Sequence, residues 1–159
     1  MENFKEFLDN GIYAINDGNY ANAIDYINKS LELKNDWEIP YFYRGVAHHA
    51  LSKFDDAIFD YTKALQLNDK MVDAYYNRAK ITLTRKDLKN PDINLAIKDL
   101  EKAIDLDDKF LDALYAIACA HKKLGNYHIS LDYLNKVIEL EPEAINARAL
   151  KKLLLQKYI

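Results

Sequence analysis

Hydrophobic residues recur along this chain at the three- and four-residue spacing of amphipathic helices. In one stretch the apolar positions are Ile24, Ile27 and Leu31. This spacing places the side chains on one stripe of a helix that packs against a core. The pattern predicts helices at nine places along the chain, at residues 2–17, 20–34, 38–51, 54–67, 72–86, 91–106, 110–124, 127–140 and 143–157.

Glycines and prolines stand where these helices are expected to begin or end. Gly18 and Gly125 follow predicted helices, at the place of a left-handed cap. Asn90 and Pro91 offer an N-cap followed by a proline at the first helical position. Pro142 follows another predicted helix. The helical pattern and the breakers therefore agree on where the chain turns.

The chain also repeats itself with a period of 34 residues. Small residues in the second half of each copy are spaced 34, 39 and 34 apart, at Ala23, Ala57, Ala96 and Ser130. Small residues in the first half are spaced 34, 34 and 39 apart, at Gly11, Gly45, Ala79 and Ala118. The third copy therefore carries a five-residue insertion between its halves, within residues 84–90. The inserted residues are mostly polar, which favours an exposed loop without a function over a secondary contact site.

This repeat resembles the tetratricopeptide repeat, a helix–turn–helix unit of 34 residues. Gly11 and Gly45 fall where the two helices of a family unit approach closely, and an aromatic precedes the second helix at Tyr20, Phe54 and Tyr127. The resemblance places four units at 4–37, 38–71, 72–110 and 111–144, with a capping helix at 145–159.

The resemblance implies an all-α fold, a right-handed α-solenoid of four helix pairs in which residues 1–159 form a single domain. The capping helix is expected to cover the fourth pair with an inward stripe of Ala147, Leu150, Leu154 and Tyr158. Most tyrosines fall at the spacing of core residues, and the core is expected to include Tyr13, Tyr26, Tyr41, Tyr61, Tyr75 and Tyr133.

Composition and charge narrow the classes of function. Of the 159 residues, 50% are hydrophobic and 30% are charged, which is typical of a globular chain. The net charge of −3 gives no general attraction to nucleic acid or to an anionic membrane. The chain starts with no apolar signal segment, and charges interrupt every apolar stretch. We therefore expect a cytoplasmic protein that binds neither nucleic acid nor membrane.

The residues capable of chemistry form no catalytic or metal-binding motif. The sequence contains neither the phosphate-binding loop motif G-x-x-x-x-G-K-[ST] nor the dinucleotide-binding motif G-x-G-x-x-G. His48 and His49 are adjacent, so they point about 100° apart on a helix and cannot hold one metal ion together. Cys119 is expected to be a small buried thiol rather than a nucleophile. The sequence therefore predicts no metal, no cofactor and no enzymatic activity.

The resemblance implies a concave groove lined by the first helix of each unit, and therefore a scaffold or adaptor that binds another protein. The N-terminal part of this groove is expected to be almost wholly apolar, which suits an amphipathic helix or an extended apolar peptide. The predicted partner-binding residues are Leu8, Ile12, Ile15, Ile39, Phe42, Val46, Tyr76, Lys80, Tyr115 and Lys122.

Some members of this family grip the acidic C-termini of heat-shock chaperones with a clamp of Lys, Arg and Asn side chains. The corresponding positions here hold Leu8, Ile12, Tyr43, Asp73 and Asn77, none of which matches the clamp. The sequence therefore predicts no binding of chaperone tails.

A second hypothesis is a self-assembling structural protein, in which copies associate through the groove and the C-terminal helix. That helix carries Leu155 and Ile159 outside its inward stripe, next to Arg148, Lys151 and Lys152. A homo-oligomer is therefore the alternative to an adaptor that binds another protein.

Overall fold

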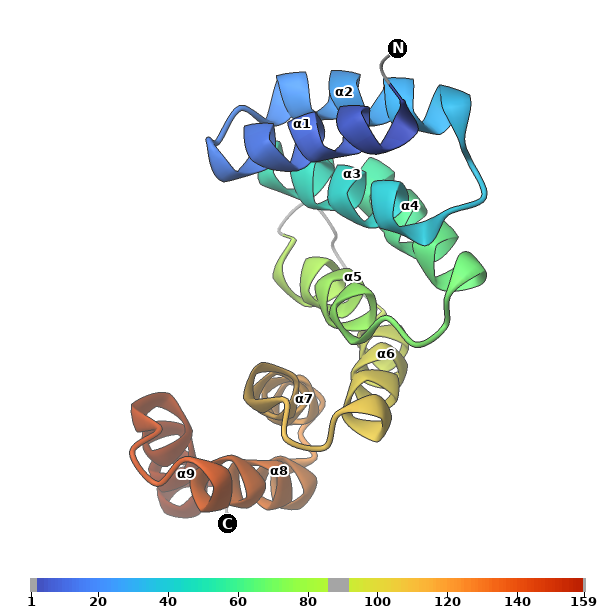
Figure 1. Cartoon of the computed structure of the whole chain (residues 1–159). Helices are drawn as coiled ribbons and strands as arrows, with labels where there is room; N and C mark the ends of the chain where they lie inside the picture. Colours follow the sequence, from blue (N-terminus) through green and yellow to red (C-terminus); the bar gives the residue numbers. More distant parts are fainter. Residues whose placement is uncertain (1–2, 86–91, 159) are drawn as a thin grey trace. The chain divides into compact units, whose positions relative to one another are not determined.

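The computed structural model describes residues 3–85 and 92–158, and these residues form helices joined by short turns (Figure 1). Within this part of the chain the helices are α1 (Phe4–Asn16), α2 (Tyr20–Leu33), α3 (Glu38–Ala50), α4 (Phe54–Leu67), α5 (Val72–Thr84), α6 (Ile93–Leu106), α7 (Leu111–Lys123), α8 (Tyr127–Leu140) and α9 (Ile145–Lys157). Each boundary lies within two residues of the predicted one. The predicted all-α helical-repeat class is confirmed.

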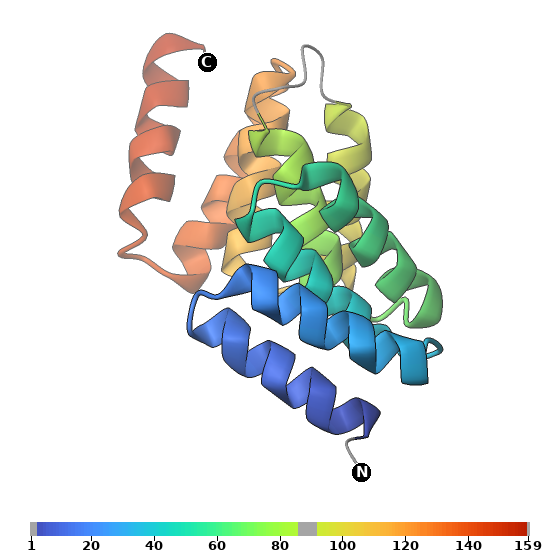
Figure 2. The same ribbon diagram turned by 90° about the horizontal axis from the view of Figure 1, so that it is seen from above.

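Contacts between residues divide the chain into two compact units, residues 1–81 and 82–159. In the first unit α1 packs on α2 and α3 on α4, while α2 and α3 join the two pairs (Figure 2). In the second unit α7 packs on α8, and α6 and α9 pack on α7 and α8 respectively. The prediction that residues 1–159 form a single domain stays a prediction.

Left-handed residues end three of the first helices. Gly18 and Gly125 have φ angles of +75° and +78°, as their positions after α1 and α7 predict. After α1, the amide of Asn19 donates to the carbonyl of Ala14 at 2.8 Å, which closes the last turn. Ser52 takes the same role after α3 with a φ of 58°, although no glycine marks that position.

The start of α6 differs from the prediction. Asp92 is the N-cap of this helix, and its carboxylate accepts a hydrogen bond from the amide of Leu95 at 3.2 Å. The helix begins at Ile93, two residues later than expected. The predicted cap at Asn90 and Pro91, and residues 86–90 of the insertion, lie outside the described residues.

The helices within each pair of the first unit touch at a glycine. A Cβ atom on Gly11 would lie 2.6 Å from Cγ1 of Ile27 in α2. A Cβ atom on Gly45 would lie 2.9 Å from Cε1 of Tyr61 in α4. Both distances are shorter than van der Waals contact, so these glycines allow the close approach that the resemblance implied.

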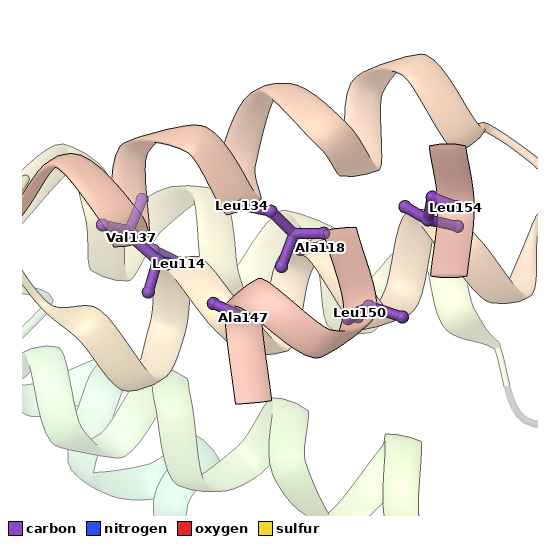
Figure 3. Packing of buried hydrophobic residues seen from close by; sticks show 7 residues of the cluster. All are labelled: Leu114, Ala118, Leu134, Val137, Ala147, Leu150 and Leu154. Atoms are coloured by element: carbon purple, nitrogen blue, oxygen red, sulfur yellow. The ribbon is translucent and has the colours of Figure 1, made fainter. Parts of the chain in front are cut away.

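Buried apolar residues form separate clusters in the two units. In the first unit one cluster contains Leu8, Ile27, Leu31, Tyr41 and Ala64. A second cluster follows along the same unit, with Ala57, Tyr61, Leu65, Ala74 and Ile81. In the second unit, Figure 3 shows side chains from α7, α8 and α9 meeting in one cluster, formed by Leu114, Ala118, Leu134, Val137, Ala147, Leu150 and Leu154.

Three of the four residues predicted for the inward stripe of α9 are buried there, at Ala147, Leu150 and Leu154. Tyr158 is the exception, because it follows the helix end and keeps 40% of its surface exposed. Its ring stacks on that of Tyr127 with centroids 4.3 Å apart.

Two of the tyrosines predicted for the core are on the surface. Tyr13 is 74% exposed and Tyr26 is 37% exposed, whereas Tyr61 is fully buried. The buried residues of α1 include Ala14, and Tyr13 lies about 100° around the helix from it. Apolar spacing alone did not show which side of α1 its neighbours would cover.

A buried ion pair, which the sequence analysis did not predict, links the helices of the first unit. Asp60 of α4 is 1% exposed and accepts hydrogen bonds from Arg44 of α3, from Nε at 2.9 Å and from Nη2 at 2.6 Å. The third contact of Arg44 runs from Nη1 to Oδ1 of Asn28 in α2 at 2.8 Å. One guanidinium thus connects three helices with bidentate geometry.

This ion pair predicts a contrast between a single and a double substitution. Asp60→Leu leaves the Arg44 guanidinium largely desolvated without its carboxylate, and it should lower the free energy of unfolding by about 3 kcal/mol. Arg44→Met combined with Asp60→Leu removes both charges and should stay within about 1 kcal/mol of the native chain. Urea denaturation followed by circular dichroism measures both variants. A double variant as unstable as the single one would contradict this account.

Candidate partner-binding surfaces

Partly exposed apolar side chains follow the first helices of the first unit. Ile12 on α1 and Ile39, Phe42 and Val46 on α3 are all half-buried. The last three recur at helical spacing, so they share one side of α3. Each of these residues packs with part of its surface on a buried cluster of this unit. We call these four residues the apolar row.

Phe42 is held in place from two directions. Its ring centroid lies 5.4 Å from that of Tyr43 in an edge arrangement, and 5.8 Å from that of the buried Tyr61. Aromatic contacts of this kind hold a ring in place before a partner binds. The ring therefore loses little further conformational entropy on binding. Phe42 therefore offers a preformed apolar platform within the row.

Two predicted partner-binding residues contribute mainly to the core. Leu8 is only 3% exposed, so the prediction of a surface role for it is wrong. The reason is that Ile27, Leu31 and Tyr41 from α2 and α3 enclose it within one cluster. Ile15 is half-buried and packs against two clusters of the same unit.

On α5, Tyr76 is half-buried and Lys80 is exposed. The Nζ atom of Lys80 lies 5.8 Å from the ring centroid of Tyr76, within the range of a cation–π contact. A group that touches this tyrosine would therefore also meet a positive charge.

In the second unit, Tyr115 of α7 lines a hollow of about 270 Å³. Asp112, Glu141 and Glu143 line the same hollow, so three carboxylates surround its apolar wall. The sequence pattern did not indicate an acidic hollow at this place. The two glutamates belong to the turn between α8 and α9, whose position next to α7 depends on tertiary packing.

Lys122 is half-buried further along α7, near Cys119. Burial raises the pKa of the Cys119 thiol, while Tyr115, Lys122 and Lys123 oppose that rise. The thiol therefore stays protonated at neutral pH, as a buried cysteine does. Lys123 donates from Nζ to the carbonyl of Leu83 at 2.9 Å and so holds the end of α5 within this unit.

Three of the four histidines pack against other side chains. His48 Nε2 lies 3.6 Å from Oδ2 of Asp60, the ring of His49 meets Phe54 edge-on, and the ring of His121 stacks on Tyr133. Burial lowers the pKa of His48, His49 and His121. Within residues 3–85 and 92–158, no group of three or more His, Cys, Asp or Glu side chains is placed to hold a metal ion.

A further surface in the second unit was not predicted as a site. Ile138 of α8 and the outer side of α9 enclose a hollow of about 450 Å³, lined by Ile138, Arg148, Lys151, Lys152, Leu155 and Gln156. The sequence did signal it, because the exposed leucine and the three cations of the last helix stand outside its inward stripe. Among the described residues, no helix is long and apolar enough to cross a membrane. The cytoplasmic location stays a prediction.

Family models match most of the repeated region. Two models of the tetratricopeptide repeat match residues 11–36 and 40–71, and a model of the Fis1 C-terminal tetratricopeptide repeat matches residues 111–158.

Two curated proteins illustrate the relatives of this chain. Human sperm-associated antigen 1 is 35% identical over 145 residues, which cover 91% of this chain and 11% of that protein. The NADPH oxidase activator of Dictyostelium discoideum is 34% identical over 55 residues, which cover 35% of this chain and 9% of that protein. The chain thus spans about a tenth of the length of these relatives.

Solved structures share the fold. A MamA protein is 21% identical with a TM-score of 0.86, over 96% of this chain and 81% of that chain. The first tetratricopeptide repeat domain of Spaghetti (RPAP3), solved with the HSP90 peptide SRMEEVD, is 22% identical with a TM-score of 0.69, over 76% of this chain and 92% of that chain. At these identities the likeness establishes the fold.

The half-buried histidines predict that stability falls on mild acidification. The unfolded chain takes up protons on histidine near pH 6.5, whereas the lowered pKa values of His48, His49 and His121 resist protonation in the folded chain. Their contribution is fully present above about pH 6.5 and is lost as the pH drops below it. The thermal midpoint should therefore be lower at about pH 5.5 than at about pH 7.5.

The control for this prediction replaces all three histidines by glutamine. The triple variant should show a smaller difference between the two midpoints, because the unfolded chain then gains fewer protons. An unchanged difference would show that other groups cause the pH dependence.

Proposed function

Because this chain belongs to the tetratricopeptide repeat family, we propose that it is an adaptor that binds a partner protein along the first helices of its first unit. Tetratricopeptide repeats mediate protein–protein interactions and are generally non-catalytic. The finer proposal is that the partner contributes an amphipathic helix or an extended apolar segment, which covers the apolar row of Ile12, Ile39, Phe42 and Val46.

The observation that carries this proposal is the partial exposure of the whole row. Each of its side chains rests on a buried cluster with one part and keeps another part accessible. Burying such surface releases about 25 cal/mol per Å², and the rigid ring of Phe42 loses little entropy when it is covered. A partner with apolar residues three to four positions apart would match the spacing along α3.

The residues at the positions of the chaperone-tail clamp argue against recognition of an acidic tail. Spaghetti (RPAP3) was solved with an HSP90 peptide, and such a peptide presents carboxylates. In this chain the clamp positions named in the sequence analysis include the buried Leu8, the half-buried Ile12 and Tyr43, and the exposed Asp73. We therefore propose that the first unit does not bind chaperone tails, because no cationic fork is available at these positions.

The test is affinity capture from the native lysate with the wild-type chain and an Ile12→Glu/Phe42→Lys variant. The variant puts charges where the partner needs apolar contact, so the captured partner should decrease at least about tenfold. A Tyr13→Glu/Phe59→Lys variant is the matched control, since these positions are 74% and 65% exposed and lie outside the row. Circular dichroism verifies that both variants keep full helicity.

Equal capture by the wild type and the Ile12→Glu/Phe42→Lys variant would contradict the proposal. Light scattering on the same samples addresses the self-assembling alternative. A homo-oligomer that dissociates in this variant would show that a second copy, rather than another protein, covers the row.

A further inference from the structure

The hollow between α8 and α9 combines apolar and basic residues. Ile138 and Leu155 provide apolar surface, with Leu155 47% exposed, while Arg148, Lys151 and Lys152 provide three cations. Arg148 makes an exposed ion pair at 3.4 Å with Glu143, a residue that does not line the hollow. Among the described residues, Lys151 and Lys152 have no ion-pair partner.

The repeat register shows which surface of α9 this is. The helix α9 follows the spacing of the first helices, so each of its residues has an equivalent in α3 three repeats earlier. The residues Arg148, Lys151, Lys152 and Leu155, which line the hollow, are equivalent in order to Tyr41, Arg44, Gly45 and His48.

In the first unit, these α3 positions face the second helix of the pair. Arg44 donates two hydrogen bonds to Asp60 of α4, and His48 lies 3.6 Å from the same carboxylate. Gly45 meets the ring of Tyr61, also in α4. Ile138 of α8 is likewise equivalent to Leu31 of α2, a core residue beside Tyr41. The hollow on α9 is therefore the place where a second helix would pack.

We propose that this hollow binds an acidic amphipathic helix of another protein, which takes the place that α4 occupies beside α3. Charge determines the choice of partner. Lys151 stands where Arg44 pairs with Asp60, and Lys152 stands where Gly45 contacts Tyr61. A helix with carboxylates at two consecutive positions, i and i+1, would meet both lysines, as Asp60 and Tyr61 meet their α3 neighbours.

The lysine at position 152 also excludes an ordinary second helix. At the equivalent Gly45 even a Cβ atom would come within 2.9 Å of Tyr61, so a lysine cannot allow the same close approach of a bulky residue. A carboxylate opposite Lys152 would accept a hydrogen bond from its ammonium group. The length of the lysine side chain would then hold the two helices further apart than Gly45 holds α3 and α4. An apolar residue one turn away from the acids would cover Ile138 and Leu155. This surface lies in the second unit and is independent of the function proposed for the apolar row.

The experiment uses a designed peptide as the probe. A fluorescein-labelled helical peptide carries glutamates at i and i+1 and leucines at i−3 and i+4, and its affinity for the full chain is measured by fluorescence anisotropy. The two probe controls are the same peptide with glutamines in place of the glutamates, and a scrambled peptide of equal charge. We expect the designed peptide to bind at least about tenfold more tightly than either control.

Variants of the chain locate the binding site. Lys151→Glu/Lys152→Glu should weaken binding of the designed peptide at least about tenfold. The matched control Lys98→Glu/Lys102→Glu makes the same charge change at exposed positions of α6 and should leave the affinity within about twofold. A Leu155→Asn variant tests the apolar part and should weaken binding as well. The Ile12→Glu/Phe42→Lys variant should bind normally, which separates this site from the apolar row.

Three outcomes would overturn the proposal. Equal loss of affinity in both lysine double variants would mean that only net charge matters. Equal binding of the scrambled peptide would mean that no helical face is recognised. Concentration-dependent self-association of the native chain that disappears in Lys151→Glu/Lys152→Glu would make a second copy, rather than another protein, the occupant of the hollow.

Discussion

The close approach of the two helices in each pair is the constraint on which the rest of the first unit depends. Gly11 and Gly45 leave room for Ile27 and Tyr61 at distances that any larger residue would obstruct. Because the second helices come this close, they bury the sides of α1 and α3 that carry these glycines. Core packing and the proposed binding surface share a contact, since the ring of Phe42 in the apolar row packs on Tyr61, the same residue that lies against Gly45.

The same position has a different residue in α9 and a different consequence. Lys152 replaces the glycine, and Lys151 replaces the arginine whose carboxylate partner lies in α4. On its other side α9 still buries Ala147, Leu150 and Leu154 against α7 and α8. One helix thus keeps the packing of a repeat on its inner face and presents positive charge on the face where the next helix would pack. In α3 the ionic contact at that place joins two helices of the fold, and in α9 we infer that the cations serve recognition.

Features determined by local sequence could be predicted, and features that depend on tertiary neighbours could not. The helices and the left-handed Gly18 and Gly125 follow from periodicity and backbone preference within a few residues. Ser52 adopts the same conformation without a glycine, because the repeat requires a turn there. The exposure of Tyr13, the burial of Leu8 and the pairing of Arg44 with Asp60 are decided by residues far away in sequence. For the candidate surfaces, the register indicated the helices that carry the half-buried apolar row, but only the packing showed that Leu8 is enclosed and that carboxylates surround Tyr115.

Site-specific photo-crosslinking tests most directly whether a partner covers the apolar row. A photoreactive phenylalanine analogue placed at position 42, in the half-buried row, is compared with the same analogue at position 59, where the native Phe59 is 65% exposed on α4. Both are irradiated in the native lysate. The account predicts a defined crosslinked product from position 42 that is absent or much weaker from position 59, despite the greater exposure of position 59. A product from position 59 alone, or equal products from both positions, would contradict it.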